Sequence, residues 1–177
     1  YSMGGAVALQ VALDRPELVG QLVWFGGASF DPGGMYPAYM AAFDSFDLHQ
    51  LDGSRWHEAY RRVAPDPGAW TSLVAKVNEL DRSGEPSWPR KRLALLQAST
   101  LLINGDSDVF RPEHAVEMFR LLGGGVFGDT PAGLPDSQLA ILPGTSHVSL
   151  VSRTELLIPI INSFLDAPIK PNKEKSS

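Results

Sequence analysis

The chain opens on a serine whose neighbours could make it a nucleophile. Tyr1-Ser2-Met3-Gly4-Gly5 matches the pattern G-x-S-x-G from its second position onward. That pattern places a serine on a sharp strand-to-helix turn, where small residues let the helix pack closely against the strand. The helix dipole would favour developing negative charge at Ser2, and the backbone N–H of Met3 is placed to donate to an oxyanion. A serine that merely caps a helix would fit the same residues, so the rest of the chain must decide.

An aspartate and a histidine follow two later strand-like runs. The apolar run Ser99–Asn104 ends shortly before Asp108, and the run Gln138–Leu142 ends shortly before His147. In open parallel sheets, groups that handle ligands lie just beyond the carboxyl ends of the strands. A serine, an aspartate and a histidine at such ends form a set for nucleophilic catalysis. Their order along this chain is not that of chymotrypsin-like or subtilisin-like enzymes.

The elements that would position these residues alternate between helix and strand. Residues 4–13 read as a helix ended by Arg15-Pro16, and residues 19–25 read as a short buried strand. Residues 111–122 and 152–165 read as two more helices, the second with Ser152 and Glu155 spaced as a capping box and Pro159 inside it. We therefore expect the α/β class, with about three parallel strands and flanking helices.

A long stretch without a convincing strand interrupts this alternation. From about Asp31 to Gln97, aromatic residues recur at helical spacing, and Asp66-Pro67 has the form of a helix start. We predict four segments: a core segment at 1–30, a helical cap at 31–97, core again at 98–167, and a flexible tail at 168–177. The cap aromatics either line a substrate pocket or form the core of the cap itself. The pocket candidates are Met3, Tyr36, Tyr39, Phe43, Trp56 and Trp70.

Three motifs together resemble those of a known family. The runs YSMGG at 1–5, LLINGDSD at 101–108 and PGTSH at 143–147 closely resemble the α/β-hydrolase superfamily, in its esterase, lactonase and perhydrolase-like branch. The resemblance implies Ser2 as nucleophile, His147 as base and Asp108 as the orienting acid. The G-x-x-D spacing of the family selects Asp108 over Asp106, which would otherwise suit a turn residue at the strand end. A histidine that only completes a turn is the alternative for His147.

The resemblance also implies a larger sheet than this sequence supplies. Only the last strands of the family's sheet have counterparts here, and the loop that gives the second oxyanion-hole donor has none. We therefore expect a C-terminal portion of such an enzyme that does not act alone, with residues 19–25 as an exposed strand edge.

Composition excludes several kinds of partner. The net charge is −5, and lysines gather only at Lys170, Lys173 and Lys175, which disfavours a nucleic-acid surface. No apolar run is long enough to cross a bilayer, and cysteine is absent. His49 and His57 match no metal-ligand spacing, and His114 is expected at a helix surface. We expect a small-molecule substrate, no cofactor, no metal, and a cytoplasmic location.

The expected reaction is hydrolysis of an ester or lactone of a small or medium apolar molecule, through an acyl-enzyme on Ser2. Carbon–carbon bond hydrolysis and peracid formation use the same triad in related proteins and remain alternatives. A non-catalytic ligand-binding protein on the same fold is a third.

Overall fold

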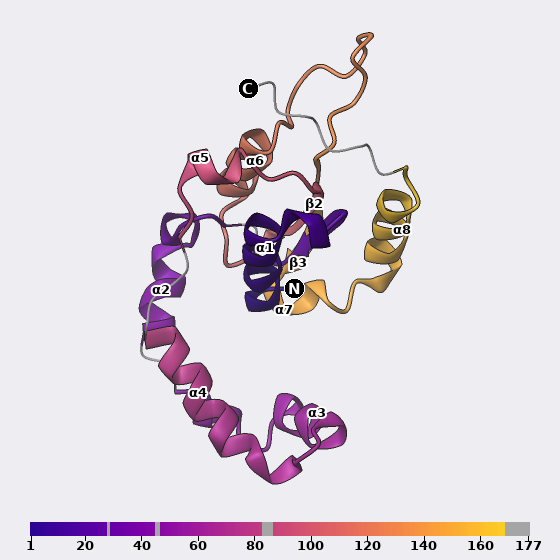
Figure 1. The fold of residues 1–177 in the computed structure, drawn as a ribbon. Helices are drawn as coiled ribbons and strands as arrows, with labels where there is room; N and C mark the ends of the chain where they lie inside the picture. Colours follow the sequence, from indigo (N-terminus) through magenta and orange to yellow (C-terminus); the bar gives the residue numbers. More distant parts are fainter. Residues whose placement is uncertain (28, 45–46, 83–86, 169–177) are drawn as a thin grey trace. The chain divides into compact units, whose positions relative to one another are not determined.

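A parallel three-stranded sheet forms the centre of the structure, in the order β1-β2-β3 (Figure 1). The computed structural model describes residues 1–27, 29–44, 47–82 and 87–168. Within them the strands are β1 (Gln21–Phe25), β2 (Ser99–Ser107) and β3 (Gln138–Ser146). The central strand β2 pairs Ser99 with Gln21 of β1 and Leu101 with Gln138 of β3. The α/β class with a parallel sheet and flanking helices is therefore confirmed.

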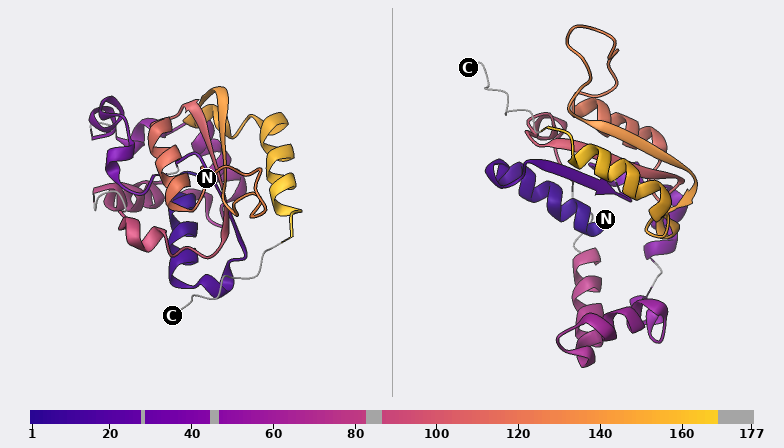
Figure 2. Two further views of the ribbon diagram at one scale, coloured as in Figure 1. Left: turned by 90° about the horizontal axis from the view of Figure 1, so that it is seen from above. Right: turned by 90° about the vertical axis from the view of Figure 1, so that its right-hand side faces the viewer.

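Alternating side chains of the strands build a separate apolar layer on each face of the sheet. On one face, Trp24 and Leu102 pack with α1 (Met3–Asp14), α5 (Arg90–Leu93) and α6 (Pro112–Leu121). On the other face, Leu101 and Ile103 pack with α7 (His147–Leu150) and α8 (Thr154–Leu165). Figure 2 shows α1 and α8 on opposite sides of the strands. This two-sided burial explains why the strands read as nearly continuous apolar runs.

The chain divides into two compact units, Tyr1–Tyr36 with Pro86–Ser177, and Pro37–Glu85. The first unit also contains the 3₁₀ turns η1 (Pro16–Leu18) and η2 (Pro32–Gly34). The predicted insertion, from about Asp31 to Gln97, is wider than the second unit. Its flanks belong to the first unit because Met35, Trp88 and Leu93 are buried there, the latter two in the same core cluster as Trp24.

The second unit, called the helical unit below, contains no strand in its described residues. Its elements are α2 (Pro37–Asp44), η3 (Leu48–Leu51), α3 (Arg55–Val63), η4 (Pro67–Ala69) and α4 (Trp70–Arg82). Asp66 caps η4 by accepting the N–H of Gly68 at 2.9 Å. The Trp70 indole stacks on His57, with ring centroids 4.6 Å apart, and its Nε1–H donates to the Asp52 carboxylate. That bond holds the pKa of Asp52 below its usual value.

One local expectation needs correction. Helix α8 begins at Thr154 after Arg153, which makes no side-chain cap, so Ser152 and Glu155 do not form the predicted capping box. A capping box does occur one helix earlier, where the hydroxyls of Ser146 and Ser149 cap α7 reciprocally. Pro159 lies inside α8, as predicted.

Within the described residues, no helix is long and apolar enough to span a membrane.

Candidate active site

Ser2 lies on a strained turn that leads directly into α1. Its φ of 51° and ψ of −132° put it alone among the described non-glycine residues with a positive φ. The Ser2 N–H is directed at two carbonyl oxygens at the carboxyl end of β1, those of Phe25 at 3.1 Å and Gly26 at 2.8 Å. These bonds attach the strained turn to the carboxyl end of β1. Such strain is characteristic of a serine presented on a strand-to-helix turn.

Close packing behind this turn depends on glycine. A Cβ on Gly5 would lie 2.1 Å from the indole of Trp24, so α1 could not approach β1 with any larger residue there. Gly26 has a φ of 64°, and a Cβ on it would lie 2.5 Å from the Tyr1 ring. Of the two glycines in the serine motif, Gly5 therefore serves the approach of α1 to the sheet, whereas a Cβ on Gly4 would meet nothing within 4 Å.

The structure brings Ser2, His147 and Asp108 together in one chain of hydrogen-bond contacts. The Ser2 hydroxyl is 3.0 Å from His147 Nε2, and His147 Nδ1 is 2.8 Å from Asp108 Oδ1. Ser2 is held at the carboxyl end of β1 by its N–H bonds, while Asp108 and His147 directly follow β2 and β3. Residues separated by 39 and 145 positions meet because parallel strands end at the same edge of the sheet.

Burial distinguishes the three side chains. Asp108 is only 4% exposed, and its Oδ1 also accepts the N–H of Val109 at 2.7 Å. The imidazole of His147 is partly exposed and begins α7, with Ser146 as its N-cap. A buried carboxylate that orients a half-accessible imidazole suits the acid and base roles predicted from the sequence.

Asp106 faces a different group from Asp108. Its two carboxylate oxygens accept the backbone N–H groups of Gly144 at 2.9 Å and Thr145 at 3.1 Å. These donors hold the pKa of Asp106 below its ordinary value, because they stabilise the charged form. Asp106 therefore ties the end of β2 to the segment that carries His147, whereas Asp108 contacts the imidazole.

Met3 occupies the first helical position after Ser2. Its N–H has no acceptor within the helix, because the first four N–H groups of any α-helix lack one. This backbone group lies next to the Ser2 hydroxyl and is available to an oxyanion. The Met3 side chain is 52% exposed.

The remaining pocket candidates are divided between the two units. Tyr36 belongs to the first unit, and its backbone N–H donates to the Val109 carbonyl at 3.1 Å. Tyr39, Trp56 and Trp70 belong to the helical unit, where Trp70 is buried against His57 and Tyr60. Phe43 lies in α2, and its side chain is outside the described part of the chain. A pocket formed by these residues stays a prediction.

Two residues near the site carry more contacts than the sequence indicated. His114 was expected at a surface, but it is 5% exposed and accepts the N–H of Phe30 at its Nε2, 3.2 Å away. Its ring stacks on Phe30 with centroids 4.1 Å apart. The Tyr1 ring stacks on His147. The one sequence feature that could have suggested this contact is the position of Tyr1 directly before Ser2.

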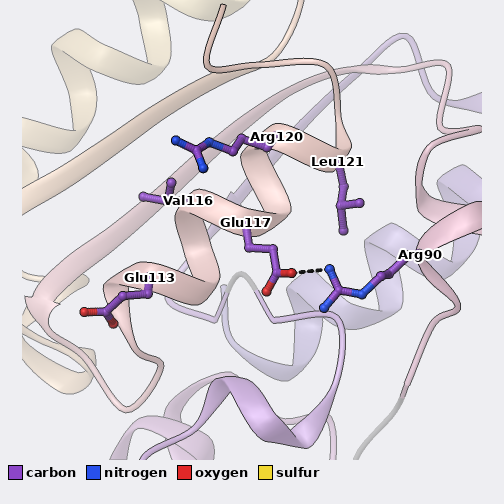
Figure 3. A pocket seen from close by; sticks show the side chains of 6 residues that line it. All are labelled: Arg90, Glu113, Val116, Glu117, Arg120 and Leu121. Carbon is purple, nitrogen blue, oxygen red and sulfur yellow. Dashed lines mark hydrogen bonds and ion pairs between the residues drawn. The ribbon is translucent and has the colours of Figure 1, made fainter.

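A hollow of about 490 Å³ lies beside α6 (Figure 3). Its lining is mostly charged, and Arg90 and Glu117 form an ion pair across it. None of the triad residues lines it; the lining consists of Arg90, Glu113, Val116, Glu117, Arg120 and Leu121. Among the described residues, no group of three or more His, Asp or Glu side chains is placed to hold a metal ion.

Solved structures share this arrangement of elements, although no family model matches the chain. A serine hydrolase involved in carbazole degradation is 25% identical, with a TM-score of 0.60 over 94% of this chain and 61% of its own. A carboxylesterase from Bacillus subtilis is 20% identical, with a TM-score of 0.57 over 93% of this chain and 57% of its own. A meta-cleavage product hydrolase from Pseudomonas fluorescens is 16% identical, with a TM-score of 0.57 over 94% and 62%.

The chain thus spans about 60% of the length of these hydrolases. In each case the match covers more than nine tenths of this chain. The chain therefore has the fold of part of an α/β-hydrolase.

Proposed function

We propose that this chain carries the catalytic triad of a serine hydrolase that cleaves an ester or lactone of a small or medium apolar molecule. The observation that carries the proposal is the continuous contact chain from Ser2 through His147 to Asp108, at 3.0 and 2.8 Å. The strained backbone of Ser2 adds to it, because such strain accompanies function more often than structure alone.

The chemistry follows from the acceptor and donor at each atom. With the Nδ1 proton shared with Asp108, Nε2 of His147 is free to take the Ser2 proton as the hydroxyl attacks the carbonyl carbon. The Met3 N–H donates to the oxygen that becomes negative. His147 then returns the proton to the leaving alcohol, and a water activated in the same way releases the acid from Ser2.

Asp108 stabilises the imidazolium that forms in each half of this reaction. Its burial matters because a carboxylate surrounded by little water interacts more strongly with a neighbouring positive charge. Asp106 is engaged with backbone donors and takes no part in the proton transfers.

One other reaction has a specific observation in its favour. The match to a meta-cleavage product hydrolase, at a TM-score of 0.57, suggests hydrolysis of a carbon–carbon bond with the same triad. Turnover of a meta-cleavage product in preference to simple esters would select this alternative over the ester hydrolase.

The test is labelling of the intact protein with a fluorophosphonate. We expect one adduct, located on Ser2 by mass spectrometry and absent in Ser2→Ala. Ser152→Ala is the matched control, since Ser152 is exposed and precedes α8, and it should label like the parent. Labelling of Ser2→Ala at another serine contradicts the assignment of the nucleophile.

A second assay separates an enzyme from a binding protein. Hydrolysis of a p-nitrophenyl ester should show a burst of p-nitrophenol followed by steady turnover. Binding of the ester without release of p-nitrophenol would show a ligand-binding protein on this fold.

A further inference from the structure

Tyr1 contacts the imidazole of His147 on a side that neither Ser2 nor Asp108 occupies. The two rings are stacked, with centroids 5.1 Å apart and planes 29° from parallel. The Tyr1 hydroxyl also donates to the backbone carbonyl of His147 at 2.9 Å. One side chain therefore contacts both the ring and the main chain of the residue that must move the proton.

Tyr1 is itself held in place by the end of β1. Its ring packs on Phe25 with centroids 5.5 Å apart, and it fills the space that a side chain on Gly26 would need. The next residue, Ser2, is bonded through its N–H to the carbonyls of these same two residues. The Tyr1 ring is thus a fixed surface against which the imidazole rests.

The two hydrogen bonds of the triad leave one motion of the imidazole unrestrained. Ser2 and Asp108 hold the ring at Nε2 and Nδ1, and the ring can still tilt about the line through these nitrogens. A stacked neighbour opposes that tilt because aromatic contacts depend on orientation. Phe110 is a second aromatic neighbour of His147, at 6.3 Å and 56°, but it is farther away and tilted.

We propose that Tyr1 is a positioning residue that sets the plane of the His147 imidazole between Ser2 and Asp108. The inference rests on the proposed function, because the imidazole must be aligned only if it transfers a proton. The hydroxyl fixes the first residue of α7, and the ring face opposes tilting. The ring also lies beside the imidazolium that forms during acylation, where an aromatic face stabilises positive charge.

A positioning role makes a specific kinetic prediction. Tyr1 acts on the proton transfer, so its loss lowers the maximum rate of acylation and leaves the half-saturating probe concentration unchanged. Tyr1→Phe keeps the stacked ring and removes only the hydroxyl bond. We expect about a threefold to tenfold lower maximum rate in this variant, as for loss of one ordinary hydrogen bond. Tyr1→Leu removes both contacts and should lower the rate about 10- to 100-fold.

Tyr60→Phe is the matched control. The Tyr60 hydroxyl also donates to a backbone carbonyl, that of Asp66 at 3.2 Å, but it lies in the helical unit. This variant should acylate at the parent rate. Thermal unfolding of all three variants shows whether any of them has lost its fold. If Tyr1→Leu is unfolded, the acylation rate of Tyr1→Phe alone tests the proposal.

A spectroscopic measurement reports the geometry without any turnover. The proton between His147 Nδ1 and Asp108 should give a far-downfield proton resonance, assigned by its loss in His147→Gln. We expect this resonance to broaden or move in Tyr1→Phe and Tyr1→Leu and to stay in place in Tyr60→Phe. A purely structural role for Tyr1 would change the unfolding midpoint and leave the resonance of the folded protein unchanged.

Two results would overturn the inference. One is an unchanged maximum rate in Tyr1→Phe with an unchanged resonance. The other is a higher half-saturating concentration at the parent's maximum rate, which would make Tyr1 a substrate contact. Failure of the parent protein to react at Ser2 would instead refute the proposed function, and the resonance would still show whether Tyr1 sets the ring.

Discussion

The two compact units differ in how much of their structure is fixed by burial. In the first unit, apolar layers on both faces of the sheet hold the strand ends that carry the triad. In the helical unit, Trp70 and Val74 are the buried apolar side chains among the described residues, and its ion pairs, such as Arg61 with Glu58, are exposed. Exposed ion pairs contribute little to stability. Reactivity should therefore depend on the first unit, while the helical unit should tolerate change.

The sharpest test of this contrast lies inside the first unit, at Asp108. Asp108→Asn keeps the shape of the side chain, but its amide would favour the wrong imidazole tautomer and could not stabilise the imidazolium. We expect the maximum rate of ester hydrolysis to fall by about 10⁴-fold, as for the same change in another serine enzyme. Steady-state kinetics measure the loss, and thermal unfolding shows that the variant keeps its fold.

Asp106, two residues earlier, should matter much less. Asp106→Asn weakens the two bonds to the Gly144 and Thr145 N–H groups and so loosens the segment before His147. We expect about a tenfold lower rate, in keeping with one or two weakened hydrogen bonds to a charged group. If Asp106→Asn were the more damaging of the two variants, the assignment of the orienting acid to Asp108 would be wrong.

The sign of the pH effect at Asp106 follows from its backbone donors. They lower its pKa in the folded protein, so the stabilisation of the loop is complete above the ordinary pKa of the group. It is lost as the pH falls through the lowered value, where the carboxylate takes up a proton. An acid-induced loss of activity in the parent should therefore contain a component that Asp106→Asn lacks.

Asp106 and Asp108 also show how much of the candidate site could be predicted from the sequence. The three strands, their order along the chain and the choice of Asp108 follow from local apolar runs and motif spacing. The role of Asp106 does not, because its partners are 38 and 39 residues away and only the pairing of β2 with β3 brings them near. The same pairing, Ser107 with Ser146, carries both strands beyond their predicted ends.

The burial of polar side chains was the other property that could not be predicted from the sequence. His114 occupies one position of a helix whose charged neighbours suggested a surface, and its partner Phe30 is 84 residues earlier. Nothing in the local pattern distinguishes it from an exposed histidine. The division at Pro37 and Glu85 was likewise narrower than the aromatic pattern suggested, since Trp88 reads like a cap aromatic but packs in the core.

Replacing the helical unit tests whether reactivity depends on the first unit alone. We expect that exchange of Pro37–Glu85 for a flexible linker changes the range of esters hydrolysed more than the acylation of Ser2 by a small fluorophosphonate. Lids chiefly shape a site and exclude water from it, and the triad contacts all lie in the first unit. The maximum acylation rate should stay within about threefold of the parent. A loss as large as that of Asp108→Asn would show that the helical unit supplies part of the reactive centre.

The smallest expected effect concerns stability at His114. Its Nε2 accepts the Phe30 N–H, which requires the neutral ring, and burial lowers its pKa. Asp31 and Glu117 favour the charged ring and Arg111 and Arg90 oppose it, and burial outweighs them. The unfolded chain therefore takes up a proton at His114 at a higher pH than the folded protein does. The contribution of His114 to stability is complete above the ordinary pKa of about 6.5 and is lost as the pH falls through the lowered value.

The measurement is the thermal unfolding midpoint of the parent and of His114→Gln between pH 7.5 and pH 5. A glutamine amide oxygen can accept the Phe30 N–H and carries no charge at any of these pH values, so it isolates the titration from the bond. We expect the parent midpoint to fall more than that of His114→Gln over this interval, because the unfolded chain takes up a proton at His114 more readily than the folded protein does. Equal slopes would mean that His114 binds a proton in the folded state as readily as in the unfolded chain, and the bond to Phe30 would then not depend on a neutral ring.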